Sequence, residues 1–307
     1  MKNKVVAVVG PTASGKSALA IDIAKKYGGE VVSADSMQIY RGMDIGTAKI
    51  TDTEGIPHHL IDIVDPSETY TLSDYLSDAD KTVKDILSRG KLPIMAGGTG
   101  LYISSFIDNI QLTEAETDEE YREYLKNYAR ENGAEKLHSL LADIDSESYK
   151  TLHVNDEKRI IRALEFFHTT GKTITEHNAE SRSVPSPYGF FIIGITFRDR
   201  QKLYDRIDRR VDMMIEDGFV EEVKRLDFES LSKTARQAIG YRQIFAYLDG
   251  IMSLDDAAED IKRESRRYAK RQLTWFRRDS RINWLYADDN ELNCELFETS
   301  MENFLDD

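Results

Sequence analysis

Short apolar runs and helix-like segments alternate over the first third of the chain. The apolar runs predict buried strands at residues 5–9, 30–34, 60–64 and 92–96. Between these runs, apolar residues at helical spacing predict helices at residues 17–27 and 73–89. Such alternation is typical of a parallel sheet flanked by helices on both faces, with ligands bound at the carboxyl ends of its strands. We therefore expect an α/β fold.

The pattern changes at residue 113. From there to about residue 180, apolar residues recur at helical spacing, for example Tyr121, Leu125 and Leu164, with no strand pattern between them. Beyond a turn-rich stretch, the pattern predicts a strand at 189–197, long helices over 201–277, a short strand at 282–286 and a terminal helix. The predicted domains are a core of residues 1–112 plus 186–307 and an all-helical insertion of residues 113–185.

Residues 10–17 read G-P-T-A-S-G-K-S, a complete G-x-x-x-x-G-K-[ST] phosphate loop behind the first predicted strand. The two glycines let successive backbone N–H groups point at phosphate oxygens, and the following helix adds its positive end. The lysine neutralises an outer phosphate, and the final serine hydroxyl suits a Mg2+ ion shared with that phosphate. The predicted diphosphate-binding residues are Gly10, Pro11, Thr12, Ala13, Ser14, Gly15, Lys16 and Ser17, with Ser17 also the metal ligand.

The phosphate loop alone does not identify its ligand. ATP, GTP and an alkyl diphosphate present the same oxygens to it, and an ordinary glycine turn is the structural alternative. The rest of the chain has to distinguish these possibilities.

Composition limits the class of protein. The chain has 307 residues, 40% of them hydrophobic, which is typical of a globular protein. Cys294 is its one cysteine, which excludes an internal disulfide framework and a cysteine-based zinc site and fits a reducing compartment. No signal-peptide pattern and no apolar stretch of membrane-spanning length occurs in the sequence. We expect a cytoplasmic protein without membrane association, and nothing in the sequence demands an oligomer, so a monomer is expected.

The charge distribution is uneven. A formal net charge of -14 argues against indiscriminate nucleic-acid binding, because the overall field repels phosphate. Residues 262–281 nevertheless carry nine basic residues against two acidic ones. Within this stretch, Arg263, Arg267, Lys270, Arg277 and Arg281 follow helical spacing. They form either a phosphate-binding stripe or an ordinary solvated helix face.

Several further motifs follow the phosphate loop in order. They read S-A-D-S-M-Q-I-Y-R-G-M-D-I-G-T-A-K at 33–49, D-I-V-D-P-S at 62–67, A-G-G-T-G-L-Y at 96–102, K-R-I-I-R-A-L-E at 158–165 and R-Q-A-I-G-Y-R-Q at 236–243. Together they resemble the tRNA dimethylallyltransferase family, also called tRNA isopentenyltransferase, over residues 5–281. The resemblance implies transfer of a dimethylallyl group from dimethylallyl diphosphate to N6 of the adenosine 3′ of the anticodon, with Mg2+ as cofactor.

The expected catalytic residues are Asp35, Thr99 and Lys16. An exocyclic amine is a poor nucleophile, so an ionised carboxylate must hold and deprotonate it, and Asp35 follows a predicted strand beside the phosphate loop. The resemblance assigns Thr99 to the reaction centre, where its hydroxyl can donate to the departing diphosphate. The alternatives are that Asp35 caps a helix or assists a metal, and that Thr99 is held in a glycine turn.

Two further cations are candidates for diphosphate binding. Arg200 and Arg206 lie near the start of a predicted helix and could supplement Lys16. Equally, they could be solvated partners of Asp205 and Asp208.

The resemblance also implies residues that contact the anticodon stem-loop. Unpaired bases are the usual target of sequence-specific RNA recognition, and chemistry on one base requires that it swings into a pocket. Gln38 has the donor and acceptor needed to read an adenine edge, although a surface turn would also explain it. Lys158 stands where the family pattern favours glutamine. The implied contacts are Asp35, Ser36, Met37, Gln38, Thr99, Arg122, Lys158, Arg159, Ile160, Ile161, Arg162, Arg236, Gln237, Ala238, Ile239, Gly240, Tyr241 and Arg242.

Three other functions share part of this pattern. A small-molecule P-loop kinase would have the loop, the sheet and an acidic residue after the second strand. An isopentenyltransferase for free adenine nucleotides would share the chemistry but would need neither the helical insertion nor the basic stretch. A nucleotide-switched RNA-binding protein would use the loop as a sensor. The six histidines lack ligand spacing, so a histidine metal site is not expected.

Overall fold

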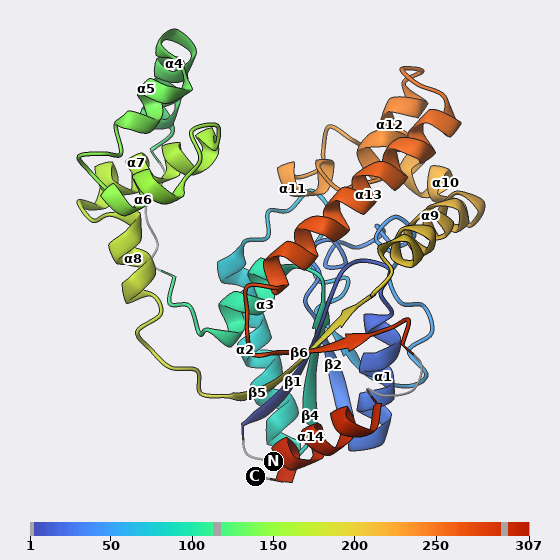
Figure 1. Cartoon of the computed structure of the whole chain (residues 1–307). Coiled ribbons are helices and arrows are strands. Elements are labelled where there is room, and N and C mark those ends of the chain that lie inside the picture. The colour runs from blue at the N-terminus through green and yellow to red at the C-terminus, as the bar shows by residue number, and fades with distance from the viewer. Residues whose placement is uncertain (1–2, 113–117, 290–293, 307) are drawn as a thin grey trace. The chain divides into compact units, whose positions relative to one another are not determined.

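Six parallel strands form the central sheet of the computed structural model, which describes residues 3–112, 118–289 and 294–306. The spatial order is β3-β2-β4-β1-β5-β6 (Figure 1). The strands are β1 (Lys4–Val9), β2 (Gly29–Ser33), β3 (His58–His59), β4 (Leu92–Gly97), β5 (Gly189–Thr196) and β6 (Ile282–Tyr286). Every pair is parallel, which confirms the predicted sheet.

One predicted strand is wrong. The pattern placed a strand at residues 60–64, whereas the structure has only the two-residue β3 just before it. Leu60 and Asp62 have φ values of +61° and +56°, in the left-handed region that no β-strand uses. Val64 makes only an isolated bridge, to Tyr40. The apolar residues of this segment are therefore buried from a loop.

Alternate side chains of the strands pack against different helices. Val6 and Val8 of β1 belong to a core cluster with residues of α1 (Lys16–Tyr27) and α14 (Cys294–Asp306). Val5, Ala7 and Val9 belong to a second cluster, with residues of α2 (Leu72–Ser88) and α3 (Gly100–Ile107) among others. Because successive strand residues point to opposite faces, the two clusters lie on the two faces of the sheet. This arrangement confirms the expected α/β class.

The predicted long helices of residues 201–277 are only partly correct. The segment consists of two long helices, α9 (Arg200–Glu216) and α13 (Leu254–Phe276), with three short ones between them: α10 (Phe219–Lys224), α11 (Lys233–Arg236) and α12 (Tyr241–Leu248). Gly218 and Gly240, both at positive φ, cap the starts of α10 and α12 and explain two of the breaks. Arg281 lies beyond the end of α13, so it is not part of the helical basic stripe.

Residues 108–186 form a separate unit. Its helices are α4 (Glu119–Asn132), α5 (Ala134–Ser139), α6 (Ser146–Thr151), α7 (Glu157–Thr170) and α8 (Ile174–Glu180), and its described residues contain no strand. Leu125, Leu137 and Leu164 belong to a core of its own. The predicted boundary at Thr113 lies outside the described residues.

Among the helices that the structure describes, none combines the length and the apolar composition required to cross a bilayer.

Candidate active site

Three loops leave neighbouring strands at the same edge of the sheet. The register pairs Ser33 of β2 with Ala96 of β4, and Val9 of β1 with Gly97 of β4. Asp35, Thr99 and the phosphate loop (residues 10–17) follow these strand ends directly. The Thr99 N–H donates to the carbonyl oxygen of Ala34 at 3.1 Å. The three predicted catalytic residues are therefore brought to one place.

The phosphate loop has the geometry of an anion cradle. Ala13 and Gly15 have φ values of +61° and +96°, which turn the backbone sharply before α1 begins at Lys16. Ser14 Oγ is buried and has no hydrogen-bond partner among the described residues. Ser17 is exposed in the first turn of α1. The loop thus has polar groups that remain available for a ligand.

The Lys16 ammonium group is held inside the site. Nζ donates to the carbonyl oxygen of Pro11 at 2.6 Å. The Lys16 residue as a whole is partly accessible to solvent. Its charged end, the ammonium group, is nevertheless surrounded by protein atoms. Burial lowers the pKa of Lys16 to about 8; the Asp35 carboxylate opposes this shift, and the Arg210 guanidinium adds to it. A cation that is costly to hold without a counterion is suited to receive a diphosphate.

Two arginines of α9 approach the phosphate loop. Arg206 Nε donates to the carbonyl oxygen of Ala13 at 2.9 Å, as expected for a loop-side cation. Arg210 Nη1 donates to Thr12 Oγ1 at 2.9 Å, and burial lowers the pKa of Arg210 while Asp35 raises it. Sequence reasoning missed Arg210. Its position one helical turn after Arg206 was the signal that could have found it.

The other predicted arginine, Arg200, lies in a pocket beside the phosphate loop. Arg200 lines a pocket with Leu203, Tyr204 and residues of α13 and makes no described hydrogen bond to the phosphate loop. Neither Arg200 nor Arg206 pairs with Asp205 or Asp208 among the described residues. Asp205 accepts from Gln201, and Asp208 pairs with Arg266.

Asp35 is fixed through one of its two oxygens. Oδ1 accepts a hydrogen bond from the backbone N–H of Met37 at 2.9 Å. Oδ2 accepts none from the described residues, so it is free to face a substrate. The Met37 N–H thus uses only one of the two carboxylate oxygens, in a short turn closed by the Asp35 side chain.

Thr99 lies next to Asp35. Its Oγ1 accepts from the Ser36 N–H at 2.9 Å and lies 3.2 Å from Ser36 Oγ, to which it donates. Tyr268 of α13 lies near Thr99 and Gln272, and burial raises the pKa of Tyr268 to about 12. Tyr268 therefore stays protonated at neutral pH.

Gln272 of α13 connects two of the three loops. Its Oε1 accepts from the Thr12 N–H at 2.9 Å, and its Nε2 donates to the Gly98 carbonyl oxygen at 2.9 Å. A Cβ at Gly98 would lie 2.2 Å from Gln272 Nε2, and a Cβ at Gly97 would lie 2.1 Å from the Ala34 carbonyl oxygen. The first two glycines of G-G-T-G are thus explained by close approach. Neither Gln272 nor Tyr268 was predicted.

The segment after Asp35 is tied down by internal contacts. Gln38 Nε2 donates to the carbonyl oxygens of Thr47 and Ala48, each at 3.3 Å. Glu222 accepts from the backbone N–H groups of Asp44, Ile45 and Gly46 at 2.6–3.1 Å and from Tyr241 Oη at 2.6 Å. Tyr241 is fully buried, so its side chain supports the loop from within the core.

The proposed RNA-contact residues fall into three kinds. Some side chains are buried, namely Ile160, Ile161, Ala238 and Tyr241. Others are exposed, namely Lys158, Arg159, Arg162, Gln237 and Arg242. Two arginines are held by the protein itself. Arg122 pairs with buried Glu165 at 2.8 Å, and Arg236 donates to the backbone carbonyls of Leu231 and Glu229.

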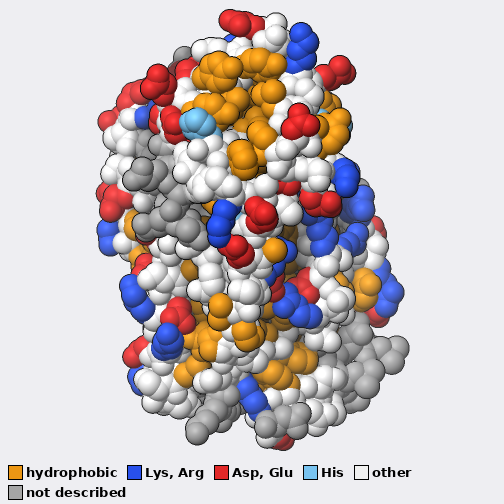
Figure 2. All heavy atoms as spheres, turned by 90° about the vertical axis from the view of Figure 1, so that its left-hand side faces the viewer, with side chains coloured by type: hydrophobic (Ala, Val, Ile, Leu, Met, Phe, Trp, Pro, Cys, Tyr) orange, Lys and Arg blue, Asp and Glu red, His pale blue; other side chains and the backbone are white. Residues whose placement is uncertain are grey.

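The surface is not uniformly acidic. Figure 2 shows basic and acidic side chains interspersed over one face of the molecule. The net charge therefore leaves room for local cationic contacts. Among the described residues, no group of three or more His, Cys, Asp and Glu side chains could hold a metal ion.

Comparison with known families gives two matches. A family model described as IPP transferase matches residues 38–279, and one described as Isopentenyl transferase matches residues 3–56. A tRNA dimethylallyltransferase from Halalkalibacterium halodurans is 46% identical over 308 residues, covering 99% of this chain and 97% of that protein. One from a Thermoanaerobacter species is 50% identical over 294 residues, covering 94% and 93%.

Solved structures give the same result. A full-length tRNA isopentenylpyrophosphate transferase from Bacillus halodurans matches with a TM-score of 0.72 and 44% identity, covering 99% of this chain and 96% of that one. A eukaryotic dimethylallyltransferase acting on tRNA matches with a TM-score of 0.82 and 29% identity, covering 99% and 80%. The family expected from the motifs is thereby confirmed.

Proposed function

Because this chain belongs to the tRNA dimethylallyltransferase family, we propose that it transfers a dimethylallyl group from dimethylallyl diphosphate to N6 of the adenosine 3′-adjacent to the anticodon in tRNA. The products are N6-isopentenyladenosine in tRNA and diphosphate. The observation that carries the proposal is the convergence of Asp35, Thr99 and the phosphate loop at one edge of the sheet.

The phosphate loop binds the leaving group. Its backbone N–H groups and the start of α1 face the diphosphate, and Lys16, Arg206 and Arg210 supply positive charge around the loop. As the allylic carbon–oxygen bond breaks, negative charge grows on the diphosphate. Cations fixed beforehand stabilise that charge without reorganisation.

Asp35 acts on the nucleophile. Oδ1 stays on the Met37 N–H, and Oδ2 accepts the proton that N6 loses as the carbon–nitrogen bond forms. The Thr99 hydroxyl turns from Ser36 to donate to the bridging oxygen of the diphosphate, while the Ser36 N–H continues to donate to Thr99 Oγ1. The bond that forms, the bond that breaks and the transferred proton balance without a covalent enzyme intermediate.

Ser17 is the residue that fits Mg2+. Its hydroxyl is exposed at the first turn of α1 and makes no hydrogen bond to the described residues. Mg2+ commonly takes one or two protein oxygens together with substrate phosphates, so the lack of an acidic cluster among the described residues agrees with this set. When bound, the ion would neutralise charge on the diphosphate.

Exposed side chains in both units are the proposed tRNA contacts. In the helical unit these are Lys158, Arg159 and Arg162; in the core they are Gln237 and Arg242. The buried members of the predicted set would act by shaping the backbone around them. The protein is proposed to act as a monomer, and a tRNA substrate together with a single cysteine supports a cytoplasmic location.

A single assay tests the proposal. Purified protein is incubated with labelled dimethylallyl diphosphate, Mg2+ and either unmodified tRNA or AMP, and a parallel reaction contains labelled ATP. Label in tRNA alone supports the proposal. Label in AMP would identify an enzyme for free nucleotides, and phosphate transfer without prenyl transfer would identify a kinase. A substrate tRNA in which the target adenosine is replaced by guanosine is the matched control.

A further inference from the structure

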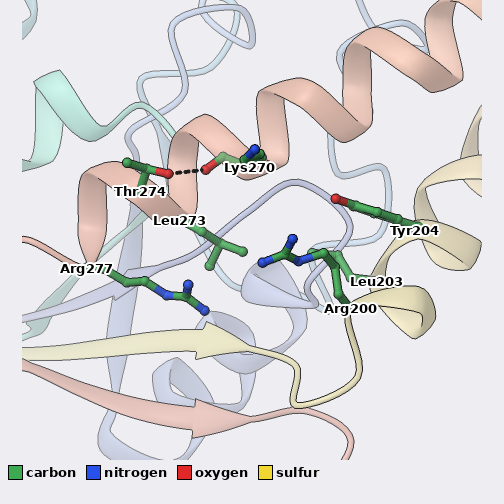
Figure 3. Close-up of a pocket in the computed structure, with 7 residues that line it drawn as sticks. All are labelled: Arg200, Leu203, Tyr204, Lys270, Leu273, Thr274 and Arg277. Atoms are coloured by element: carbon green, nitrogen blue, oxygen red, sulfur yellow. Dashed lines mark hydrogen bonds between the residues drawn. The ribbon is translucent and has the colours of Figure 1, made fainter.

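A pocket between α9 and α13 lies outside the catalytic residues named above. Figure 3 shows Arg200 and Arg277 pointing toward one another beside Leu273, with Lys270 above them. Leu203, Tyr204 and Thr274 complete the lining, and the cavity has a volume of about 170 Å³. The three cations come from two helices that are separate in sequence but packed together.

The charges of this pocket are not neutralised. Neither Arg200 nor Lys270 nor Arg277 forms an ion pair with any residue that the structure describes. Their neighbours on α13 differ, because Arg263 pairs with Asp260, Arg266 with Asp208 and Arg267 with Glu264. Three like charges around one cavity repel each other, and an anion seated there would relieve that repulsion.

The pocket is next to the phosphate loop but separate from it. Its floor residues Leu203 and Leu273 belong to an apolar cluster that also contains Ala13. The arginines that hydrogen-bond to the loop are Arg206 and Arg210, which do not line the pocket. The site therefore extends the positive charge beyond the diphosphate cradle toward the exposed side of α13.

We propose that this pocket seats one backbone phosphate of the bound tRNA, an inference that rests on the proposed function. A phosphodiester has one negative charge, and the C–H faces of the ribose rings beside it can pack against apolar side chains. That combination matches three cations over a floor of leucine side chains and the Tyr204 ring. Lys270 on α13 and Arg277 at the cap that ends it also continue the spacing of Arg263 and Arg267, as a polynucleotide contact requires and a small anion does not.

The first test removes the charges. The pocket variant carries Arg200→Gln, Lys270→Gln and Arg277→Gln. The matched control carries Arg209→Gln, Arg225→Gln and Lys91→Gln, and so removes an equal number of positive charges from exposed positions. Binding of a fluorescent anticodon stem-loop is measured by anisotropy over a salt series. The pocket variant should bind at least about 10-fold more weakly and lower the log–log salt slope by about 0.7 to 0.9, the value for one phosphate. The control should leave the slope unchanged.

The second test identifies the phosphate without changing the protein. Stem-loops carrying one neutral methylphosphonate at each position in turn are bound to wild type and to the pocket variant. One position should weaken binding to wild type and have no further effect on the pocket variant. If every position affects the two proteins equally, the proposal is wrong even where the variant is poorly folded, because the wild-type scan gives the reference.

Other outcomes separate this inference from the proposed function. Suppose that wild type transfers the prenyl group to tRNA, and that the pocket variant keeps the tRNA affinity and the salt slope of wild type. This result would overturn the phosphate-binding role of the pocket and leave the proposed function intact. A raised KM for dimethylallyl diphosphate at unchanged tRNA affinity would assign the pocket to the diphosphate and also overturn the inference. Wild type that transfers no prenyl group would contradict the proposed function first.

Discussion

Lys16→Met should stabilise the fold while abolishing diphosphate binding. Burial lowers the pKa of Lys16 from its ordinary value of 10.5 to about 8. At 1.36 kcal/mol for each factor of ten, this corresponds to about 3 kcal/mol spent on keeping the ammonium charged at neutral pH. The hydrogen bond from Nζ to Pro11 offsets about 1 kcal/mol, so the variant should gain about 2 kcal/mol at pH 7.

The gain should depend on pH in a defined direction. Between pH 8 and 10.5 the unfolded chain keeps a proton on Lys16 that the folded chain has released, so the stability of wild type rises there. The advantage of the methionine variant is therefore full below pH 8 and falls by about 2 kcal/mol by pH 9.5.

The assay is urea unfolding followed by tryptophan fluorescence at pH 7 and pH 9.5. Both tryptophans, Trp275 and Trp284, belong to the same unit as Lys16, so the signal reports the relevant part of the chain. Lys91→Met, at an exposed position, is the control and should show no such pH dependence. A variant less stable than wild type at pH 7, or a gain that does not change with pH, would refute the reasoning.

Four further variants test other parts of the structure. Asp35→Asn keeps the acceptor for the Met37 N–H, so it should lower turnover by about 10²-fold or more while tRNA affinity stays unchanged. Thr99→Ala should have the same effect. Wild-type rates of these variants in single-turnover assays would reject both catalytic roles. Arg159→Gln with Arg162→Gln should weaken tRNA binding and flatten its salt dependence in filter binding, without changing the KM for dimethylallyl diphosphate. Glu222→Ala leaves three backbone N–H groups without their acceptor and should cost about 3 kcal/mol in urea unfolding; a loss below about 1 kcal/mol would contradict its supporting role.

Local sequence was sufficient for the parts of the site that lie on one continuous segment. The phosphate loop and its flanking strand were predictable because the strand, the turn and the helix start follow each other within a few residues. Asp35 and Thr99 were predictable because each directly follows a strand of a parallel sheet. Each apolar run determines where a strand lies, and the parallel order of the strands then brings their carboxyl ends together.

Residues that approach the site from distant helices were not predictable. Gln272 and Tyr268 lie on α13 and reach the loops only through tertiary packing, and an isolated glutamine or tyrosine in a helix carries no signal of its own. Strand prediction failed at 60–64 because this segment buries its apolar side chains with Leu60 and Asp62 in the left-handed backbone region. An apolar sequence pattern carries no information about φ. Arg200 and Arg206 have equal standing in the sequence, but only the packing of α9 directs one to the phosphate loop and the other to a separate pocket.

The bridge made by Gln272 has a consequence for biosynthesis. The phosphate loop leaves the ribosome well before its partner for the Thr12 N–H, which lies 260 positions later. A nascent or prematurely terminated chain can therefore form strands β1 to β5 and the phosphate loop without the helix that joins the loops. Competence for catalysis should require α13, and fragments lacking α13 should be inert.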